Sequence, residues 1–295
     1  MNKSVALVLA SGGARGLAQI GAIEELENRD YKIHSIAGSS MGSIIGGVYA
    51  SGHLSEFSEW MQGLDKSDVF QLLDFTFSLG FVKAERVFEE ISKIIGRPNI
   101  EDFEIDLQIV ATNLKEEKEH VFSSGSLIEA MRASTAYPTI ITPAIHDGHF
   151  LVDGGVLNPL PLNRVRRLND DILVSVDLGA KIPYKSPNRP SLQNGNEDSN
   201  SAYAMAQRTF SKYFGGKSKK SNKEKWSYFK LLTQTINVMH NQLNELALIQ
   251  CPPDINIPIS FRAADTFDFY RAKELIEYGK IQTAIALDNY EKKNI

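Results

Sequence analysis

The chain has 295 residues, of which 42% are hydrophobic and 23% are charged, a composition typical of a globular protein with a sizeable core. The formal net charge of −4 argues against a general nucleic-acid-binding protein, because such proteins usually carry a basic face. Cys251 is the only cysteine, which excludes an internal disulfide framework and indicates a reducing compartment. We therefore expect a cytoplasmic protein without a nucleic-acid partner.

Strand and helix patterns alternate through the first 52 residues. The apolar run VALVLA at residues 5–10 predicts a buried strand and is too short for a signal-peptide core or a membrane span. A helical pattern follows at 16–30, a short strand at 32–38 and a second helix at 41–52. This alternation implies a parallel sheet with crossover helices. Because no run of about 18 apolar residues occurs, any membrane contact would be peripheral.

The rest of the chain continues the α/β pattern. We predict helices at 53–65, 83–96, 126–138, 229–248 and 271–293, and strands at 105–114, 120–125, 149–155, 171–179 and 254–260. Between about 184 and 226 the sequence becomes polar and then basic, which is typical of a flexible insertion. We expect one α/β domain spanning residues 1–295, with two domains as the weaker alternative.

The pattern G-x-S-x-G occurs at Gly38-Ser39-Ser40-Met41-Gly42, with Ser40 at its centre. A predicted strand precedes it and a predicted helix follows it, and such a sharp turn exposes the central hydroxyl at the positive end of the helix. Ser40 is therefore a candidate nucleophile, and the Met41 N–H would point toward an oxygen anion formed beside it. Glycines on either side allow close packing of the chain. The alternative is that the serines only cap the helix.

A second glycine-rich turn, Ser11-Gly12-Gly13-Ala14-Arg15-Gly16, also lies between a predicted strand and a predicted helix. Unobstructed backbone N–H groups at a helix N-terminus suit either a phosphate or the oxyanion of an acyl-transfer reaction. The spacing fits neither the dinucleotide fingerprint nor the P-loop. A simple tight turn is the alternative, but the neighbouring turn at Ser40 favours an oxyanion hole.

A serine nucleophile needs a base. A serine–acid–histidine triad fits poorly, because the turn at Ser40 comes early in the chain, after only the second predicted strand. In addition, the late histidine, His240, lies within an amphipathic helix, where a packed or solvated role is expected. Asp153 is the better candidate, since an apolar strand delivers it to a Gly154-Gly155 turn at the carboxyl end of the sheet. Burial would raise its pKa and make it a better base. Turn chemistry alone is the alternative explanation of this segment.

Three stretches, LASGGARG, GSSMG and VDGG, occur in this order and together resemble the patatin-like phospholipases, in particular their bacterial members and the catalytic domain of neuropathy target esterase. The segment RASTAYPTIITP at 132–143 resembles the family's Arg-Ala-Ser segment, and FDFYRAKELIEYG resembles its C-terminal helix. The resemblance runs nearly end to end, except across 184–226. It implies a three-layer α/β/α fold with a mostly parallel sheet.

The resemblance also implies a chemistry. Ser40 would attack an ester carbonyl, Asp153 would accept its proton as the second member of a dyad, and water would hydrolyse the acyl-enzyme. The N–H groups of Gly12, Gly13 and Ala14 would bind the oxyanion, while Arg15 and Gly16 complete the family's loop pattern Gly-Gly-x-Arg-Gly. No metal or cofactor is implied, and the substrates would be lipids or other acyl esters.

The sequence is also compatible with two other functions, and it leaves two roles for the lysines of the insertion. An acyltransferase would use the same acyl-serine, and a non-catalytic lipid-binding protein could share the fold, although a mere binding site needs neither the dyad nor the glycine loop. In the insertion, five lysines bracketed by aromatic residues could contact an anionic membrane surface, or they could belong to an ordinary solvated loop. These lysines are Lys217, Lys219, Lys220, Lys223 and Lys225.

Overall fold

The computed structural model describes residues 3–72, 84–138, 140–187 and 228–293. The strands are β1 (Ser4–Leu9), β2 (Lys32–Ser39), β3 (Asp106–Asn113), β4 (Lys118–Phe122), β5 (Ala144–His146), β6 (His149–Asp153), β7 (Ile172–Ala180) and β8 (Ile255–Ser260). The α-helices are α1 (Ala18–Asn28), α2 (Met41–Ala50), α3 (Leu54–Gly63), α4 (Lys66–Leu72), α5 (Glu85–Ile95), α6 (Leu127–Ser134), α8 (Tyr228–Gln250) and α9 (Ala272–Lys293). Short 3-10 helices are η1 (Gly13–Leu17), η2 (Ile100–Asp102), η3 (Gly154–Val156) and η4 (Phe269–Arg271).

The strands form one mixed sheet in the order β5-β6-β3-β2-β1-β7-β8, with β4 also paired to β3. The pairs β3–β2, β2–β1, β1–β7 and β7–β8 are parallel, whereas β4 and β6 run antiparallel to β3. The predicted parallel sheet is thus confirmed in its centre. Residues 5–9 of β1 are completely buried, as expected for a central parallel strand covered on both faces.

Strands β2 and β6 meet end to end along one edge of β3. Val110 of β3 pairs with β2 on one side and β4 on the other, and Ala111 pairs with β6 and β4. Because a strand has only two edges, β2 and β6 occupy the same edge. Ser39 is the partner of Val110 and Asp153 is the partner of Ala111, so the carboxyl ends of two strands that run in opposite directions meet there.

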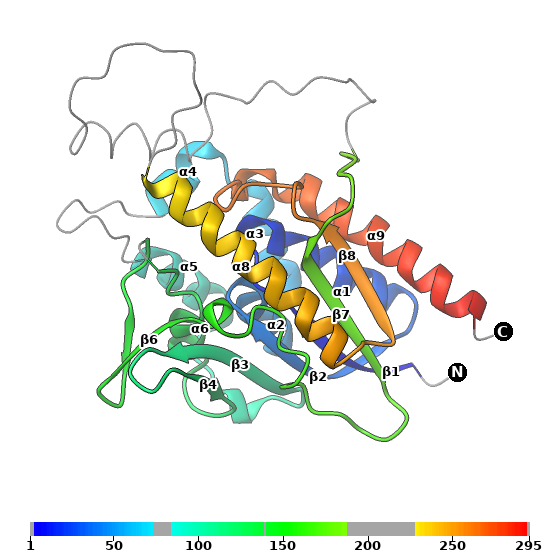
Figure 1. Cartoon of the computed structure of the whole chain (residues 1–295), viewed down its shortest axis with the longest axis horizontal. Coiled ribbons are helices and arrows are strands. Elements are labelled where there is room, and N and C mark those ends of the chain that lie inside the picture. Colours follow the sequence, from blue (N-terminus) through cyan, green and yellow to red (C-terminus); the bar gives the residue numbers. More distant parts are fainter. Residues whose placement is uncertain (1–2, 73–83, 139, 188–227, 294–295) are drawn as a thin grey trace, which may run out of the picture.

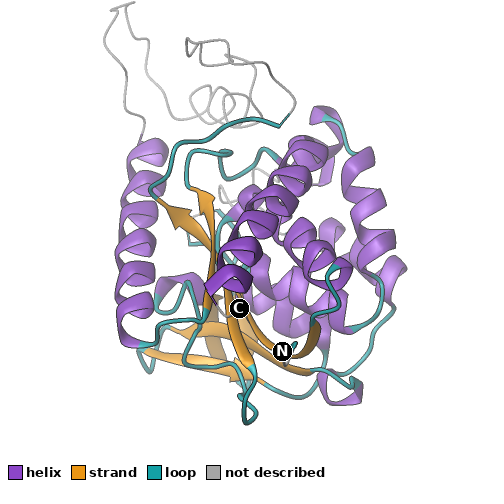
Figure 2. Cartoon of the chain, turned by 90° about the vertical axis from the view of Figure 1, so that its right-hand side faces the viewer, coloured by secondary structure: helices purple, strands orange, loops and turns teal. Residues whose placement is uncertain are grey.

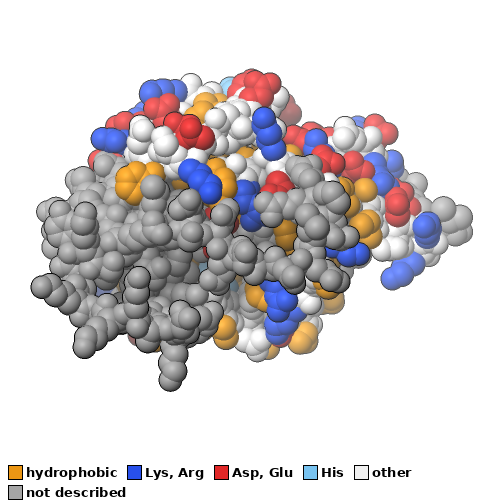
Figure 3. Space-filling model, turned by 90° about the horizontal axis from the view of Figure 1, so that it is seen from above, with side chains coloured by type: hydrophobic (Ala, Val, Ile, Leu, Met, Phe, Trp, Pro, Cys, Tyr) orange, Lys and Arg blue, Asp and Glu red, His pale blue; other side chains and the backbone are white. Residues whose placement is uncertain are grey.

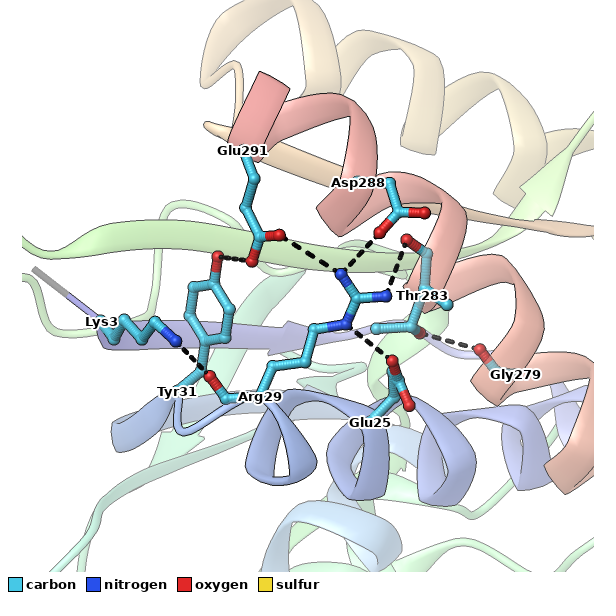
Figure 4. Close-up of polar contacts among 9 residues, drawn as sticks. Lys3, Glu25, Arg29, Tyr31, Gly279, Thr283, Asp288 and Glu291 are labelled. Atoms are coloured by element: carbon cyan, nitrogen blue, oxygen red, sulfur yellow. Dashed lines mark hydrogen bonds and ion pairs between the residues drawn. The ribbon is translucent and has the colours of Figure 1, made fainter. Parts of the chain in front are cut away.

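Helices cover both faces of the sheet and give three layers (Figure 2). Helix α8 packs along β7 on one face, whereas α1, α2 and α9 lie on the other (Figures 1 and 2). Polar contacts join the C-terminal ends of α1 and α9 (Figure 4). Arg29, which pairs with Glu25 of α1 at 2.8 Å, also contacts Asp288 of α9 at 2.7 Å, and the Tyr31 hydroxyl donates to Glu291 at 3.2 Å. The C-terminal helix is thereby attached to the first crossover helix.

Besides short 3-10 helices, the described part of the chain contains a helix and a strand that were not predicted. The short helix α4 and the three-residue strand β5 were not expected, because neither is long enough to show a clear periodicity. Of the predicted insertion, residues 184–187 are described, and Ser186 donates a hydrogen bond to Glu274 at 2.7 Å. Its five lysines lie outside the described residues. Among the helices that are described, none combines the length and apolar character needed to cross a membrane.

The surface carries charges of both signs. Seen from above, Lys and Arg side chains are interspersed with Asp and Glu side chains over the described part of this face (Figure 3). This face therefore presents no large field of one sign within its described residues.

Candidate active site

Ser40 lies on a strained turn between β2 and α2. Its φ angle is 53° and its ψ angle is −121°, which is an unfavourable conformation for a residue other than glycine and is the strain predicted for a nucleophile elbow. The turn is tight because Gly42 lies against β1, where a Cβ would come within 2.1 Å of the Leu9 carbonyl oxygen. A Cβ on Gly38 would likewise come within 2.4 Å of the Gly42 carbonyl oxygen. The Ser40 hydroxyl makes no capping bond to helix α2, which removes the alternative of a simple N-cap.

Ser134 of helix α6 holds the strained turn in place. The Ser40 N–H donates to Ser134 Oγ at 2.9 Å, and Ser134 Oγ donates to the Val110 carbonyl oxygen at 2.6 Å. Both bonds are buried. Ser134 belongs to the Arg-Ala-Ser segment of the sequence, but the sequence alone indicates no role for it, because nothing local to it points to the turn 94 residues earlier.

Asp153 accepts a hydrogen bond from the Ser40 hydroxyl, with 2.6 Å between Ser40 Oγ and Asp153 Oδ2. Its Oδ1 accepts from the Gly155 N–H at 2.7 Å, so the predicted turn chemistry is present as well. Gly154 lies against Val110 and Ser39, where β2 and β6 meet. The side chain is 1% exposed, and burial raises the pKa of Asp153 to about 7, although the bonds from Ser40 and Gly155 oppose the rise.

The glycine loop after β1 lies beside this pair. Gly12, Gly13, Ser40 and Met41 all line the same cavity. The Ala14 N–H, however, donates to the Thr266 carbonyl oxygen at 3.0 Å, so this predicted oxyanion donor already has an acceptor.

Arg15 and Gly16 of this loop have structural contacts of their own. The Arg15 side chain is buried, and its guanidinium donates to the Ala264 carbonyl oxygen at 3.2 Å. Burial lowers the pKa of Arg15, and the charge of Asp265 opposes this. Gly16 lies against the Met41 side chain, which brings the loop next to the elbow.

The cavity beside Ser40 has a large apolar wall, and a few polar residues complete its lining. Its volume is about 140 Å³, close to that of an engineered protein cavity that holds a benzene molecule. Helices α2, α3, α4 and α5 supply the apolar wall, which includes Ile44, Phe57, Trp60, Leu72 and Phe88. The loop after β1, the turn after α6 and helix α8 supply Ser11, Arg15, Tyr137, Asn237 and His240.

Tyr137 and His240 are among the polar lining residues that were not predicted to belong to the site, as is Asn237. His240 is buried, as one of its two expected roles required, but it also lines the cavity. Tyr137 belongs to the quoted segment 132–143 without having been singled out. No local sequence signal could have identified them, because both reach the site only through packing of distant elements. Among the described residues, no cluster of three His, Cys, Asp or Glu side chains suits a metal ion.

A sequence model of the patatin-like phospholipase family matches residues 7–165, which is more than half of the chain and includes both Ser40 and Asp153. The chain belongs to this family. Its patatin-like segment holds the elbow, the glycine loop and the Asp-Gly-Gly turn, whereas α8 and α9 lie beyond the matched residues.

Several proteins are similar to this patatin-like chain. An uncharacterised NTE family protein of Mycobacterium tuberculosis is 44% identical over 175 residues, which are 59% of this chain and 49% of that protein. Lysophospholipase NTE1 of Coccidioides immitis is 35% identical over 187 residues, which are 60% of this chain and 12% of that protein. The chain thus matches about half or less of the length of these relatives.

The crystal structure of VipD from Legionella pneumophila has the same fold, with a TM-score of 0.55. The likeness covers 98% of this chain and 67% of VipD, at 14% sequence identity. This likeness supports the three-layer α/β/α architecture. At 14% identity it carries no information about the reaction.

Proposed function

We propose that this protein is a serine hydrolase of lipid acyl esters that works through a Ser40–Asp153 dyad. The observation that carries the proposal is the direct bond of 2.6 Å from the hydroxyl of a strained serine to a buried carboxylate whose pKa is raised to about 7. A carboxylate with such a pKa is a much better base than an ordinary aspartate and is still ionised in part at neutral pH. Membership of a phospholipase family and an apolar cavity wall support a lipid as the substrate.

The proposed reaction has two halves. Ser40 Oγ attacks the ester carbonyl carbon while Asp153 takes its proton, and the tetrahedral intermediate then expels the alcohol, which receives that proton from Asp153. The acyl group is now bonded to Ser40 Oγ. Water attacks this ester with Asp153 again as the base, and the fatty acid leaves as Ser40 regains its hydrogen.

The oxyanion formed in both halves needs hydrogen-bond donors. We propose the N–H groups of Gly12, Gly13 and Met41 for this role, since these residues line the cavity with Ser40. Ala14 is left out because its N–H is bonded to Thr266. The acyl chain would lie along the apolar wall formed by α2 to α5.

The test is covalent labelling with a fluorophosphonate, read by intact mass, on the wild type and on three variants. The wild type should gain one adduct, Ser40→Ala should gain none, and Asp153→Asn should react at least about 100-fold more slowly, because a general base contributes 10²–10⁴ in rate. Ser39→Ala is the matched control and should label like the wild type, since Ser39 Oγ makes no hydrogen bond within the described structure. An adduct on Ser40→Ala would contradict the proposal. Acceptor alcohols added to a lipid assay would show whether the acyl group goes to water or to an alcohol.

A further inference from the structure

The glycine loop is anchored on both sides of residues 12–13, the proposed oxyanion donors. The Ser11 N–H donates to the Pro159 carbonyl oxygen at 2.7 Å, and the Ala14 N–H donates to the Thr266 carbonyl oxygen at 3.0 Å. Because glycine has more backbone freedom than any other residue, the directions of the two donor N–H groups depend on these anchors.

The second anchor is a turn formed by residues 264–268, which follows strand β8. This turn also accepts from the Arg15 guanidinium, which donates to the Ala264 carbonyl oxygen at 3.2 Å. Gly13 lies against the turn with a φ angle of 56°, and a Cβ on it would come within 2.7 Å of the Thr266 carbonyl oxygen. The carbonyl groups of the turn therefore fix the second half of the glycine loop.

Asp268 closes this turn. Its Oδ2 accepts from the Asp265 N–H at 3.1 Å, and its own N–H donates to the Asp265 carbonyl oxygen at 3.2 Å. The Arg271 guanidinium lies 3.6 Å from the same carboxylate oxygen. The Asp268 side chain is buried and does not line the cavity, unlike its neighbours Phe267 and Phe269. Asp268 can thus influence the site only through the turn.

The placement of the donors matters because an oxyanion hole stabilises charge only where its N–H groups already point. Losing one donor lowers kcat about 100-fold or more, and a misplacement of about 1 Å can cost about as much. The carbonyl oxygen of the ester carries its full negative charge only in the transition state. A displaced loop therefore slows the reaction more than it weakens substrate binding.

We propose that Asp268 is a positioning residue for the oxyanion hole, because it closes the turn whose carbonyl groups fix the glycine loop. The family model ends at residue 165, so this turn lies beyond the segment that contains the loop and the dyad. A late part of the chain thus sets the geometry of an early one. The inference rests on the proposed hydrolase function and adds a residue to the same site.

The test uses two ketones with the same alkyl chain as inhibitors of the hydrolysis of para-nitrophenyl butyrate. With octyl trifluoromethyl ketone, Ser40 Oγ adds to the carbonyl carbon, its proton passes to Asp153, and the ketone oxygen becomes an oxyanion. Octyl methyl ketone forms no stable adduct, so its inhibition constant reports binding of the chain alone. The ratio of the two inhibition constants therefore measures how well the oxyanion is stabilised.

Asp268→Ala should raise the inhibition constant of the trifluoromethyl ketone about tenfold or more and lower kcat by a similar factor. KM and the inhibition constant of the methyl ketone should stay near their wild-type values, because neither involves an oxyanion. Asp268→Asn should resemble the wild type, since its amide oxygen can still accept from the Asp265 N–H. A merely destabilising role would reduce the amount of folded enzyme and would change neither inhibition constant.

Asp171→Ala is the matched control. Asp171 also closes a turn, in which it accepts from the Leu168 N–H at 2.7 Å and pairs with Arg167. It precedes the amino end of β7, whereas the glycine loop follows the carboxyl end of the parallel strand β1, so the two lie at opposite ends of the sheet. This variant should lower stability and leave both inhibition constants unchanged.

The outcomes separate the two proposals. If folded Asp268→Ala keeps the wild-type ratio of inhibition constants, or weakens both ketones equally, Asp268 does not position the oxyanion hole. If Asp268→Ala does not fold, Arg15→Lys tests the same contact from the loop side, because it removes the guanidinium that donates to Ala264. It should then raise the constant of the trifluoromethyl ketone alone, and an unchanged constant would overturn the inference. A folded wild type that hydrolyses no ester would overturn the proposed function as well.

Discussion

Among the residues of the proposed mechanism, Asp153 is the one whose pKa the structure shifts. Its carboxyl group is 1% exposed and has no cationic partner at hydrogen-bond distance among the described residues, so burial dominates and its pKa rises to about 7. The two hydrogen bonds it accepts, from Ser40 and Gly155, orient it. Burial therefore brings the pKa of Asp153 close to neutral pH, which is the range suited to a general base that works at neutral pH.

The pH dependence of the reaction follows from this pKa. Only the ionised carboxylate can take the proton of Ser40, so kcat/KM should increase with pH and reach half of its plateau near pH 7. The measurement is kcat/KM for a soluble short-chain ester between pH 5 and 9. His240→Gln serves as the control and should keep the midpoint, because His240 ionises near pH 4. A profile that is flat between pH 5.5 and 8.5 would speak against Asp153 as the base.

At the scale of elements, the site depends on three segments that meet at Val110 and Ala111 of β3. Strand β2 ends with Ser39 paired to Val110, β6 ends with Asp153 paired to Ala111, and α6 contributes Ser134. Ser134 bonds the Val110 carbonyl oxygen and the Ser40 N–H at once. It is a positioning residue, because it holds the turn and does not face the cavity.

Substituting Ser134→Ala should loosen the elbow. The Ser40 N–H and the Val110 carbonyl oxygen would both lose a buried partner, which should lower the free energy of unfolding by about 1–3 kcal/mol. Fluorophosphonate labelling should slow markedly, because Ser40 would no longer be held in its strained conformation. Urea unfolding and labelling rates measure the two effects. Ser43→Ala serves as the comparison variant, because it also removes a buried hydroxyl, which donates to the Ser40 carbonyl oxygen at 2.6 Å. If Ser134→Ala and the wild type label at the same rate, Ser134 does not position the nucleophile.

At the scale of the whole molecule, the cavity is assembled from segments far apart in the sequence. Its lining includes residues 11–13, Arg15 and residues of helix α8, and its apolar wall is formed by α2 to α5. The dyad comes from the segment that matches the family, whereas α8 lies outside it. The cavity thus joins residues of the matched segment with residues that lie beyond it.

The apolar wall should set the preference for acyl chain length. Leu72 of α4 is half-buried, lines the cavity and takes no part in the dyad. Leu72→Trp should occupy space on this wall, so kcat/KM for a dodecanoyl ester should fall about tenfold or more while that for an acetyl ester stays close to the wild-type value. A series of aryl esters from acetyl to dodecanoyl measures this. Equal losses for all chain lengths would mean that the acyl chain does not lie against α4.

Most of the fold and the two central residues of the site could be predicted from the sequence. The strands, the long helices and the turns are encoded locally, in apolar periodicity and in glycine-rich turns, and Ser40 and Asp153 lie at such turns. The predictions for the insertion beyond residue 187, the single domain and the cytoplasmic location stay predictions. The occupied N–H of Ala14 could not be predicted, because its acceptor, Thr266, is 252 residues away in the chain.

The sequence by itself determined the α/β class, the order of the elements and the residue types of the proposed dyad, because these depend on neighbours in the chain. Only the tertiary structure decided that β2 and β6 meet end to end, that Ser134 holds Ser40, and that Tyr137 and His240 lie beside the carboxylate. Each of these contacts joins residues that are far apart in sequence, and their geometry arises from strand pairing and helix packing. The arrangement of the candidate site is therefore a property of the packed molecule.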